Sequence, residues 1–151
     1  MKYITQLLLG GILFVVAAIC ALYEGSAVRD IPWEWAYTTP FSQLFGISIV
    51  TGQEISQLDF LVYAAKYQPV FPILMLISLC YSYFVLRYWV VSHYPKVGQL
   101  LTVVVSVLFI GASIALFKAS TTGGILLFWL LLSMALINSA LSFKFLKPAV
   151  Q

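Results

Sequence analysis

The placement of the acidic residues sets the strongest limit on how this chain can fold. All five Asp and Glu residues of the 151-residue sequence lie between positions 24 and 68, and long apolar runs flank this stretch. Only 9% of the residues are charged, whereas a soluble domain carries about 25%. So few charges cannot cover a water-facing surface, so the sequence indicates an integral membrane protein with one long polar loop.

Four apolar runs are long enough to cross a bilayer, because a transmembrane helix needs about 20 predominantly apolar residues. The predicted spans cover about residues 4–23, 70–91, 100–117 and 125–143, and together they make residues 1–151 a single membrane domain. A cleaved signal peptide is the competing interpretation of the first run. Its apolar region is normally about 7–15 residues long, so retention as a span is favoured. The short links between the later spans predict an all-α, four-transmembrane antiparallel helix bundle.

Several residues within the spans suggest how the helices pack. Small residues form one possible close-packing face of the first span: Gly10, Gly11, Ala17 and Ala21. Cys20 and Cys80 lie at different depths, which predicts two free thiols and no disulfide. Asn138 is expected to hydrogen-bond to a neighbouring helix, and Arg87 is expected to extend its charge to the membrane surface at the end of its span.

The polar stretch, residues 24–68, is expected to be an ordered loop. Residues 36–39 and 47–50 are β-branched or aromatic, and Thr51-Gly52 resembles a hairpin turn, so a small sheet is predicted. Ser56 followed by Asp59 resembles a capping box, and apolar residues then recur at helical spacing. A short amphipathic helix is therefore predicted over about 57–67, before Pro69 ends it.

The distribution of basic residues predicts the orientation. With the N-terminus inside, five bases are cytoplasmic: Lys2, Arg87, Lys96, Lys144 and Lys147. Three are then outside: Arg29, Lys66 and Lys118. Since cytoplasmic loops carry the excess of Lys and Arg, we expect a multi-pass protein of the cell membrane with both termini cytoplasmic and residues 24–68 outside the cell.

The sequence offers little for catalysis. It has no metal-ligand spacing and no nucleophile motif, and its one histidine, His93, lies across the membrane from every acid. We therefore predict no enzyme activity, no cofactor and no metal. The basic residues are scattered rather than clustered, which argues against nucleic-acid binding.

The densest charge group predicts the candidate site. Six residues of the polar loop form it: Glu24, Arg29, Asp30, Trp33, Glu34 and Trp35. They could bind a partner just outside the membrane. Alternatively, ion pairs could simply hold the loop, with Glu24 against Arg29 or Lys118, while the tryptophans anchor it at the interface. In a strand, Trp33 and Trp35 would share one face.

Two segments carry a family resemblance, YEGSAVRDIPWEW and ISQLDFLVYAAKYQPVFPILM. They resemble a family of small, uncharacterised four-helix membrane proteins from Gram-positive spore-forming bacteria, which implies topology and localisation but no site. The layout also resembles the claudin plan of a short inner tail, a span, a large outer loop and three more spans. The paired loop cysteines of claudins are missing, so that analogy is architectural only.

Three functions remain open from the sequence. The leading one is a non-enzymatic membrane protein that meets a partner protein or envelope component through its outer loop. The second is binding or passage of a small apolar molecule or lipid between the helices, in a pocket lined by Ser78, Ser82 or Asn138. The third is a membrane enzyme that uses Glu24, Asp30, Glu34 and Asp59, which would require these acids to converge.

Overall fold

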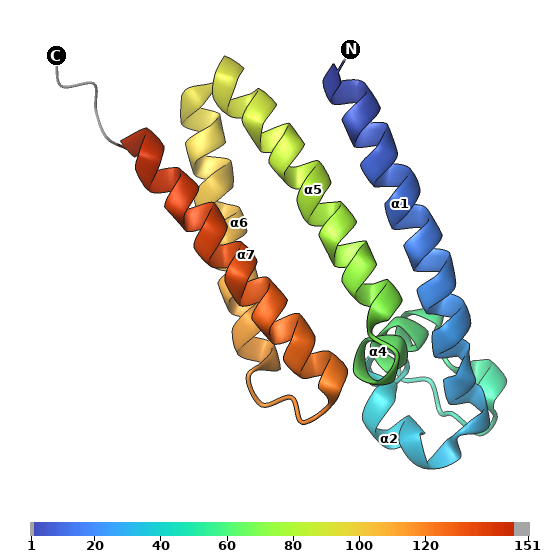
Figure 1. Cartoon of the computed structure of the whole chain (residues 1–151). Coiled ribbons are helices and arrows are strands. Elements are labelled where there is room, and N and C mark those ends of the chain that lie inside the picture. The colour runs from blue at the N-terminus through green and yellow to red at the C-terminus, as the bar shows by residue number, and fades with distance from the viewer. Residues whose placement is uncertain (1, 147–151) are drawn as a thin grey trace, which may run out of the picture.

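A computed structural model describes the backbone of residues 2–146 and the side chains of residues 2–141. Four long helices dominate it: α1 (Lys2–Gly25), α5 (Val70–His93), α6 (Pro95–Leu116) and α7 (Thr122–Leu146). All four are long and apolar enough to cross a membrane (Figure 1). They coincide with the four predicted spans, so the number and positions of these helices are confirmed.

The long helices run antiparallel and pack as two pairs. α1 lies mainly against α5, and α6 lies mainly against α7. The short helix α4 (Gln57–Tyr67) joins the pairs at one end, where it contacts α1, α5 and α7 (Figure 1). At the opposite end α5 turns directly into α6, and α1 begins there. The sequence predicted one bundle of neighbouring helices, but not this division into pairs.

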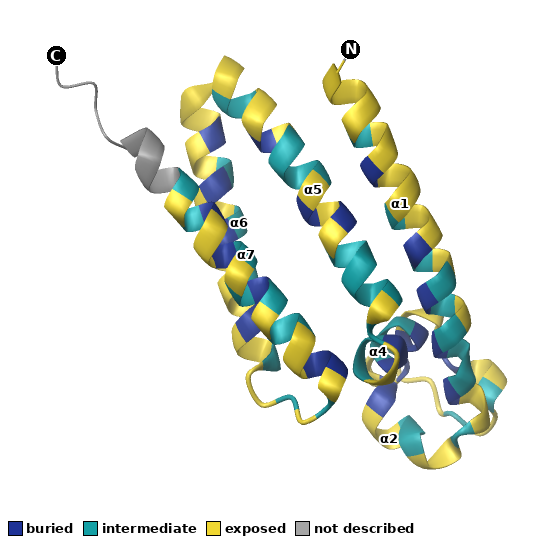
Figure 2. Ribbon diagram, viewed as in Figure 1, coloured by how far each residue is buried: buried dark blue, intermediate teal, exposed yellow. Residues whose placement is uncertain are grey.

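Figure 2 shows that buried positions are few along the long helices and that most positions are exposed or intermediate. The exposed positions are mostly large and apolar, whereas many of the buried ones are small or polar. The buried positions of α1 are Gly10, Ala17, Ala21 and Gly25, and those of α6 are Gly98, Thr102, Ser106 and Ser113. Large side chains such as Leu8, Ile12 and Val107 are more than half exposed, at 60%, 63% and 63%. This distribution suits lipid, where small residues allow close helix contacts and apolar residues need no covering.

Glycines show which face of α1 touches α5. A Cβ at Gly10 would overlap the Ser82 hydroxyl and lie 3.2 Å from the Tyr81 ring. A Cβ at Gly11 would have no neighbour within 4 Å. The predicted small-residue face is therefore confirmed for Gly10, Ala17 and Ala21, but it is wrong for Gly11. Both cysteines are free, as predicted.

Residues 26–67 fold into a helical cap over one end of the long helices. Its elements are η1 (Ser26–Asp30), η2 (Pro32–Glu34), α2 (Trp35–Thr38), α3 (Pro40–Leu44), η3 (Gly52–Glu54) and α4. No strand occurs in the described residues 2–146, so the predicted sheet is wrong. The amphipathic helix over residues 57–67 is confirmed by α4.

Local hydrogen bonds explain why the predicted strands do not form. The Thr38 and Thr39 hydroxyls donate to carbonyls four residues earlier, those of Glu34 (2.7 Å) and Trp35 (2.6 Å), which supports helical backbone despite the β-branched side chains. Thr51 does not begin a hairpin turn. It starts η3 in a capping box with Glu54.

The cap has its own core and is fixed to two long helices. Val28, Ile55, Phe60 and Tyr63 form this core. A Cβ at Gly25, the last residue of α1, would overlap the backbone carbonyl of Phe60. A Cβ at Gly123 in α7 would likewise overlap the carbonyl of Ala65. α4 is thus held between α1 and α7 at two places where backbones touch.

Candidate interaction surface on the cap

A buried carboxylate organises the cap. Asp59 is completely buried, and its oxygens accept hydrogen bonds from the backbone N–H groups of Phe41 (2.8 Å) and Ser42 (2.9 Å) and from the Ser42 hydroxyl (2.6 Å). The same hydroxyl accepts from the N–H of Ser56 (2.9 Å). These bonds join the first turn of α3 to the beginning of α4.

The predicted capping box at α4 is only half correct. Ser56 does cap the helix, since its hydroxyl accepts from the N–H of Leu58 (3.3 Å). Asp59 does not return a bond to Ser56, because its carboxylate faces the first turn of α3. Asp59 is therefore a structural residue of the cap, and it is not available as a site acid.

The two cap tryptophans have opposite surroundings. Trp35 packs on the cap core and donates its indole N–H to the carbonyl of Val28 (2.8 Å). Trp33 is 73% exposed, and Tyr37, one helical turn further on, is 75% exposed. The expectation that the tryptophans share a strand face is wrong, because residues two apart in helical backbone point in different directions. The exposed aromatic partner of Trp33 is Tyr37, which sequence reasoning missed.

Within residues 2–141, whose side chains the structure describes, the charged residues of the predicted site form no ion pair. Arg29 is exposed, and its guanidinium carbon lies 4.8 Å from the centroid of the Phe60 ring. Asp30 is exposed, and Glu34 accepts a hydrogen bond from the Tyr67 hydroxyl (2.9 Å), which raises the pKa of Tyr67. Lys66 donates to the carbonyl of Tyr37. Hydrogen bonds and packing hold the cap, rather than the predicted ion pairs.

Glu24 occupies an unusual position at the junction of α1 and the cap. It is half-buried, and its Oε2 is shielded from solvent without a hydrogen-bond partner among the described residues. The expected pairing with Arg29 or Lys118 is absent from the part of the chain that the structure describes. A shielded carboxylate oxygen of this kind is an open acceptor, which a donor from outside the chain could satisfy.

Three of the five acids accept hydrogen bonds from other residues of the cap. Among the described residues, no group of three His, Cys, Asp or Glu side chains is placed to hold a metal ion. Asp59 and Glu54 accept hydrogen bonds from backbone N–H groups, and Glu34 accepts one from a tyrosine. These three acids therefore already have hydrogen-bond partners within the cap.

We expect the stability of the cap to depend on pH through Glu54. Its carboxylate accepts from the N–H groups of Thr51 (3.0 Å) and Val50 (2.6 Å), which lowers the pKa of Glu54 below its ordinary value of 4.5. The ionised Glu54 therefore contributes its full stabilisation above pH 4.5, the ordinary pKa of the group. This stabilisation is lost as the pH falls through the lower pKa of Glu54 in the folded state. In thermal unfolding, the advantage of the wild type over Glu54→Gln should shrink across this acid range. Asp30→Asn is the matched control, and an equal shrinkage there would contradict the prediction.

A second buried polar cluster lies between the long helices, near the end opposite the cap. The Asn138 amide donates to the carbonyl of Thr102 (3.0 Å) and the hydroxyl of Ser106 (3.0 Å), and it accepts from the Tyr83 hydroxyl (2.9 Å). Arg87 is only 6% exposed and donates from Nε to the Thr102 hydroxyl (2.9 Å). The predicted role of Asn138 as an interhelical link is confirmed. The expectation that Arg87 reaches the membrane surface is wrong, because a hydroxyl on α6 accepts from it inside the helices.

Removal of the Asn138 amide should loosen the contact among α5, α6 and α7. We expect Asn138→Ala to lower the free energy of unfolding in a bilayer by about 1–2 kcal/mol, since interhelical hydrogen bonds in lipid have that strength. Steric trapping or thermal unfolding in nanodiscs would measure the change. Ser133→Ala is the control, because among the described residues the Ser133 hydroxyl donates to a carbonyl of its own helix, that of Leu130. Equal stabilities of the two variants would contradict a linking role.

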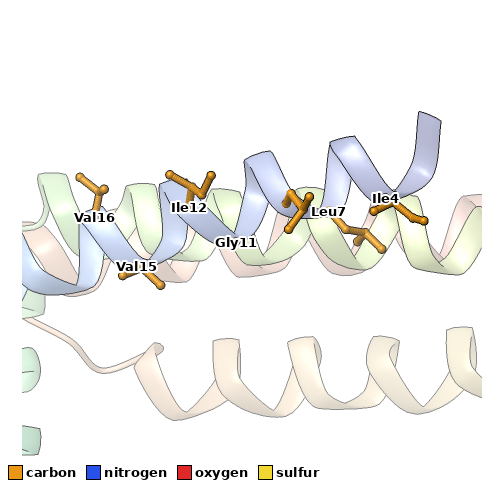
Figure 3. A pocket seen from close by; sticks show the side chains of 7 residues that line it. Ile4, Leu7, Gly11, Ile12, Val15 and Val16 are labelled. Atoms are coloured by element: carbon orange, nitrogen blue, oxygen red, sulfur yellow. The ribbon is translucent and has the colours of Figure 1, made fainter. Parts of the chain in front are cut away.

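Two apolar depressions are candidate lipid contacts. A cleft of about 280 Å³ lies where α1, α4, α5 and α7 meet, with a lining that includes Phe14, Leu61, Met75 and Leu127. None of Ser78, Ser82 and Asn138 lines this cleft. A larger depression of about 570 Å³ lies along α1 alone, around Gly11 (Figure 3).

Comparison with known proteins places the chain in a family. The family described as "Domain of unknown function (DUF4306)" matches residues 4–91, which comprise most of α1, the cap and nearly all of α5. The chain belongs to this family. The "Uncharacterized protein YjdJ" of Bacillus subtilis (strain 168) is 39% identical over 80 residues, covering 52% of this chain and 73% of that protein. No solved structure matches the chain.

The family assignment confirms the resemblance to an uncharacterised family that the sequence suggested. The matched residues also form a structural unit, because α1 packs on α5 and the cap connects them. α6 and α7 lie beyond the matched residues. The candidate surface on the cap therefore belongs to the part of the chain that defines the family.

Proposed function

We propose that the chain is a multi-pass protein of the cell membrane with both termini in the cytoplasm and the cap outside. The four apolar helices and their small, polar interior support the embedding in lipid. The five-to-three division of the bases supports the orientation. In this orientation the buried polar cluster of Arg87 and Asn138 lies nearer the cytoplasmic surface.

Within this placement, the chain acts as a non-enzymatic interaction protein whose cap docks a partner protein or envelope component. The observation that carries this proposal is the exposed pair Trp33 and Tyr37, at 73% and 75% exposure, on a cap that Asp59 holds in one conformation. Large aromatic side chains supply most of the binding energy of protein interfaces, and a rigid support reduces the entropy lost on binding. Arg29, Asp30 and Glu34 add charge close by in the sequence.

Site-specific crosslinking in intact cells tests the proposal. A photoreactive residue at position 33 or 37 should capture the same discrete partner, because both side chains are exposed and lie four residues apart in consecutive helical elements of the cap. Gln53 is the control position, since it is also an exposed cap residue but lies in η3. Capture of lipid only, or of the same random neighbours at all three positions, would contradict docking and favour interfacial anchoring of Trp33.

The apolar cleft supports a second candidate function, binding of a small apolar molecule or lipid between the helices. The lining of the cleft comes from four helices, and the cleft lies where α4 joins the two helix pairs. Leu79→Trp, which adds volume to the lining, should then reduce uptake of an apolar fluorescent probe by the purified protein. Unchanged uptake would count against this second candidate.

A further inference from the structure

A groove follows the contact between α1 and α5 at the end opposite the cap. Tyr3, Ile4, Leu7 and Trp89 help to line a depression of about 400 Å³. A second depression of about 360 Å³ shares Tyr3 and Val85 with the first, so the two adjoin between the first turns of α1 and the later part of α5. We call these two adjoining depressions the α1–α5 recess.

The recess combines an apolar wall with polar groups near the helix ends. Ile4, Leu7 and Leu86 provide the apolar wall. Gln6, Tyr81 and Tyr88 line the second depression together with Tyr3, whose ring centroid lies 6.2 Å from that of Tyr88. In the part of the chain that the structure describes, the hydroxyls of these three tyrosines and the Gln6 amide have no hydrogen-bond partner. An amphipathic occupant would suit such a lining, with a hydrocarbon part and a polar part that accepts hydrogen bonds.

The charge around the recess is positive. Lys2 is exposed and directly precedes Tyr3, and Lys96 begins α6 at the same end of the molecule. Every acid of the sequence lies between positions 24 and 68, so the nearest one along α1 is Glu24, about 33 Å away at 1.5 Å per residue. The positive charge near the recess and the hydrogen-bond donors that line it thus favour an anionic ligand.

We propose that the α1–α5 recess binds an anionic phospholipid of the cytoplasmic leaflet. Its acyl chain lies along Ile4, Leu7 and Val85, while its phosphate is held by Lys2 and by donors from Tyr3 and Tyr88. The negative surface of that leaflet supplies such lipids next to basic residues at helix ends. The proposal rests on the proposed membrane placement, but it is independent of docking at the cap.

Native mass spectrometry of the full chain, released from nanodiscs of phosphatidylcholine and phosphatidylglycerol, tests the site. The wild type should retain phosphatidylglycerol in preference to phosphatidylcholine. In the triple variant Lys2→Gln, Tyr3→Phe, Tyr88→Phe, the ratio of retained phosphatidylglycerol to phosphatidylcholine should fall by a factor of at least about five. This is the factor expected for one lysine near an anionic surface. Phenylalanine keeps each ring and removes only the hydroxyl.

The matched control is Lys118→Gln with Tyr23→Phe, which removes an exposed base and an exposed tyrosine at the end that carries the cap. It should retain the lipid as the wild type does. Equal retention of both lipids by the wild type, or an equal loss in both variants, would overturn the proposed site. If the triple variant does not fold, the single variant Lys2→Gln tests the site, because Lys2 is exposed and its replacement should not disturb folding. Failure of the wild type to enter nanodiscs would instead refute the membrane placement.

Discussion

Gly25→Ala is expected to detach the cap from α1 and to lower the free energy of unfolding by about 3 kcal/mol, the upper part of the range for overpacking. The backbone at Gly25 is right-handed helical (φ −66°, ψ −22°), so an alanine fits the local conformation. The added methyl group, however, would overlap the carbonyl of Phe60 and lie 2.5 Å from its carbonyl carbon. Because these are backbone atoms of α4, they cannot move aside without displacing the helix.

Gly11→Ala is the matched control, because a methyl group there has no neighbour within 4 Å. This variant should be as stable as the wild type, or more stable by up to about 1 kcal/mol, since alanine favours a helix over glycine. Thermal unfolding in nanodiscs compares the two, and limited proteolysis within residues 26–56 reports whether the cap has detached. Equal stability of both variants, with an intact cap, would show that α4 does not rest on Gly25.

Asp59→Ala should lower the free energy of unfolding at least as much as Gly25→Ala. The change leaves three donors without this acceptor: the buried N–H group and hydroxyl of Ser42, and the part-buried N–H group of Phe41. At about 1–3 kcal/mol for each unsatisfied donor, and with the hydroxyl free to turn elsewhere, we expect a loss of about 4 kcal/mol. α3 should lose its fixed position before the long helices unfold.

Hydrogen exchange measures this effect at the residues concerned. The amides of Phe41 and Ser42 should exchange much faster in Asp59→Ala, while amides in the middle of α5 and α6 should keep their protection. Asp30→Ala is the control, because Asp30 is exposed, and a surface change of this kind shifts stability by only about 0.5 kcal/mol. Unchanged exchange at Phe41 and Ser42 would mean that Asp59 does not hold α3.

The long helices could be predicted from the sequence because their signal is strong and local. About 20 consecutive apolar residues have few alternatives to a transmembrane helix, and the runs coincide with α1, α5, α6 and α7. α4 could be predicted equally well, since Ser56 caps its beginning and Pro69 lies just beyond its end. These elements depend on nearby residues, so a single sequence is sufficient to place them.

The cap could not be predicted in the same way, because distant contacts decide it. Thr38 and Thr39 suggested a strand, but their hydroxyls bond to helical carbonyls. The acceptor that fixes α3 is Asp59, 17 residues after Ser42. The close approach of α4 to α1 depends on the missing side chain of Gly25, a contact across 35 residues that no local pattern reveals.

The sequence places the six candidate site residues next to one another, but it does not distinguish the exposed ones from those that pack inside the cap. Glu24, Arg29, Asp30, Trp33, Glu34 and Trp35 all lie in the cap or directly before it. Only the fold shows that Trp35 supports the core while Trp33 is exposed beside Tyr37. Had helical backbone been assumed there, the four-residue spacing of Trp33 and Tyr37 would have identified the pair.

The membrane topology is the claim on which the proposals rest, and cysteine labelling in intact cells tests it most directly. In a background of Cys20→Ala and Cys80→Ala, single changes Trp33→Cys and His93→Cys place a thiol at each end of the long helices. A membrane-impermeant maleimide should label position 33 in intact cells and position 93 only after permeabilisation. Labelling of position 93 but not of position 33 in intact cells would reverse the orientation, and labelling of both would contradict a bilayer between them.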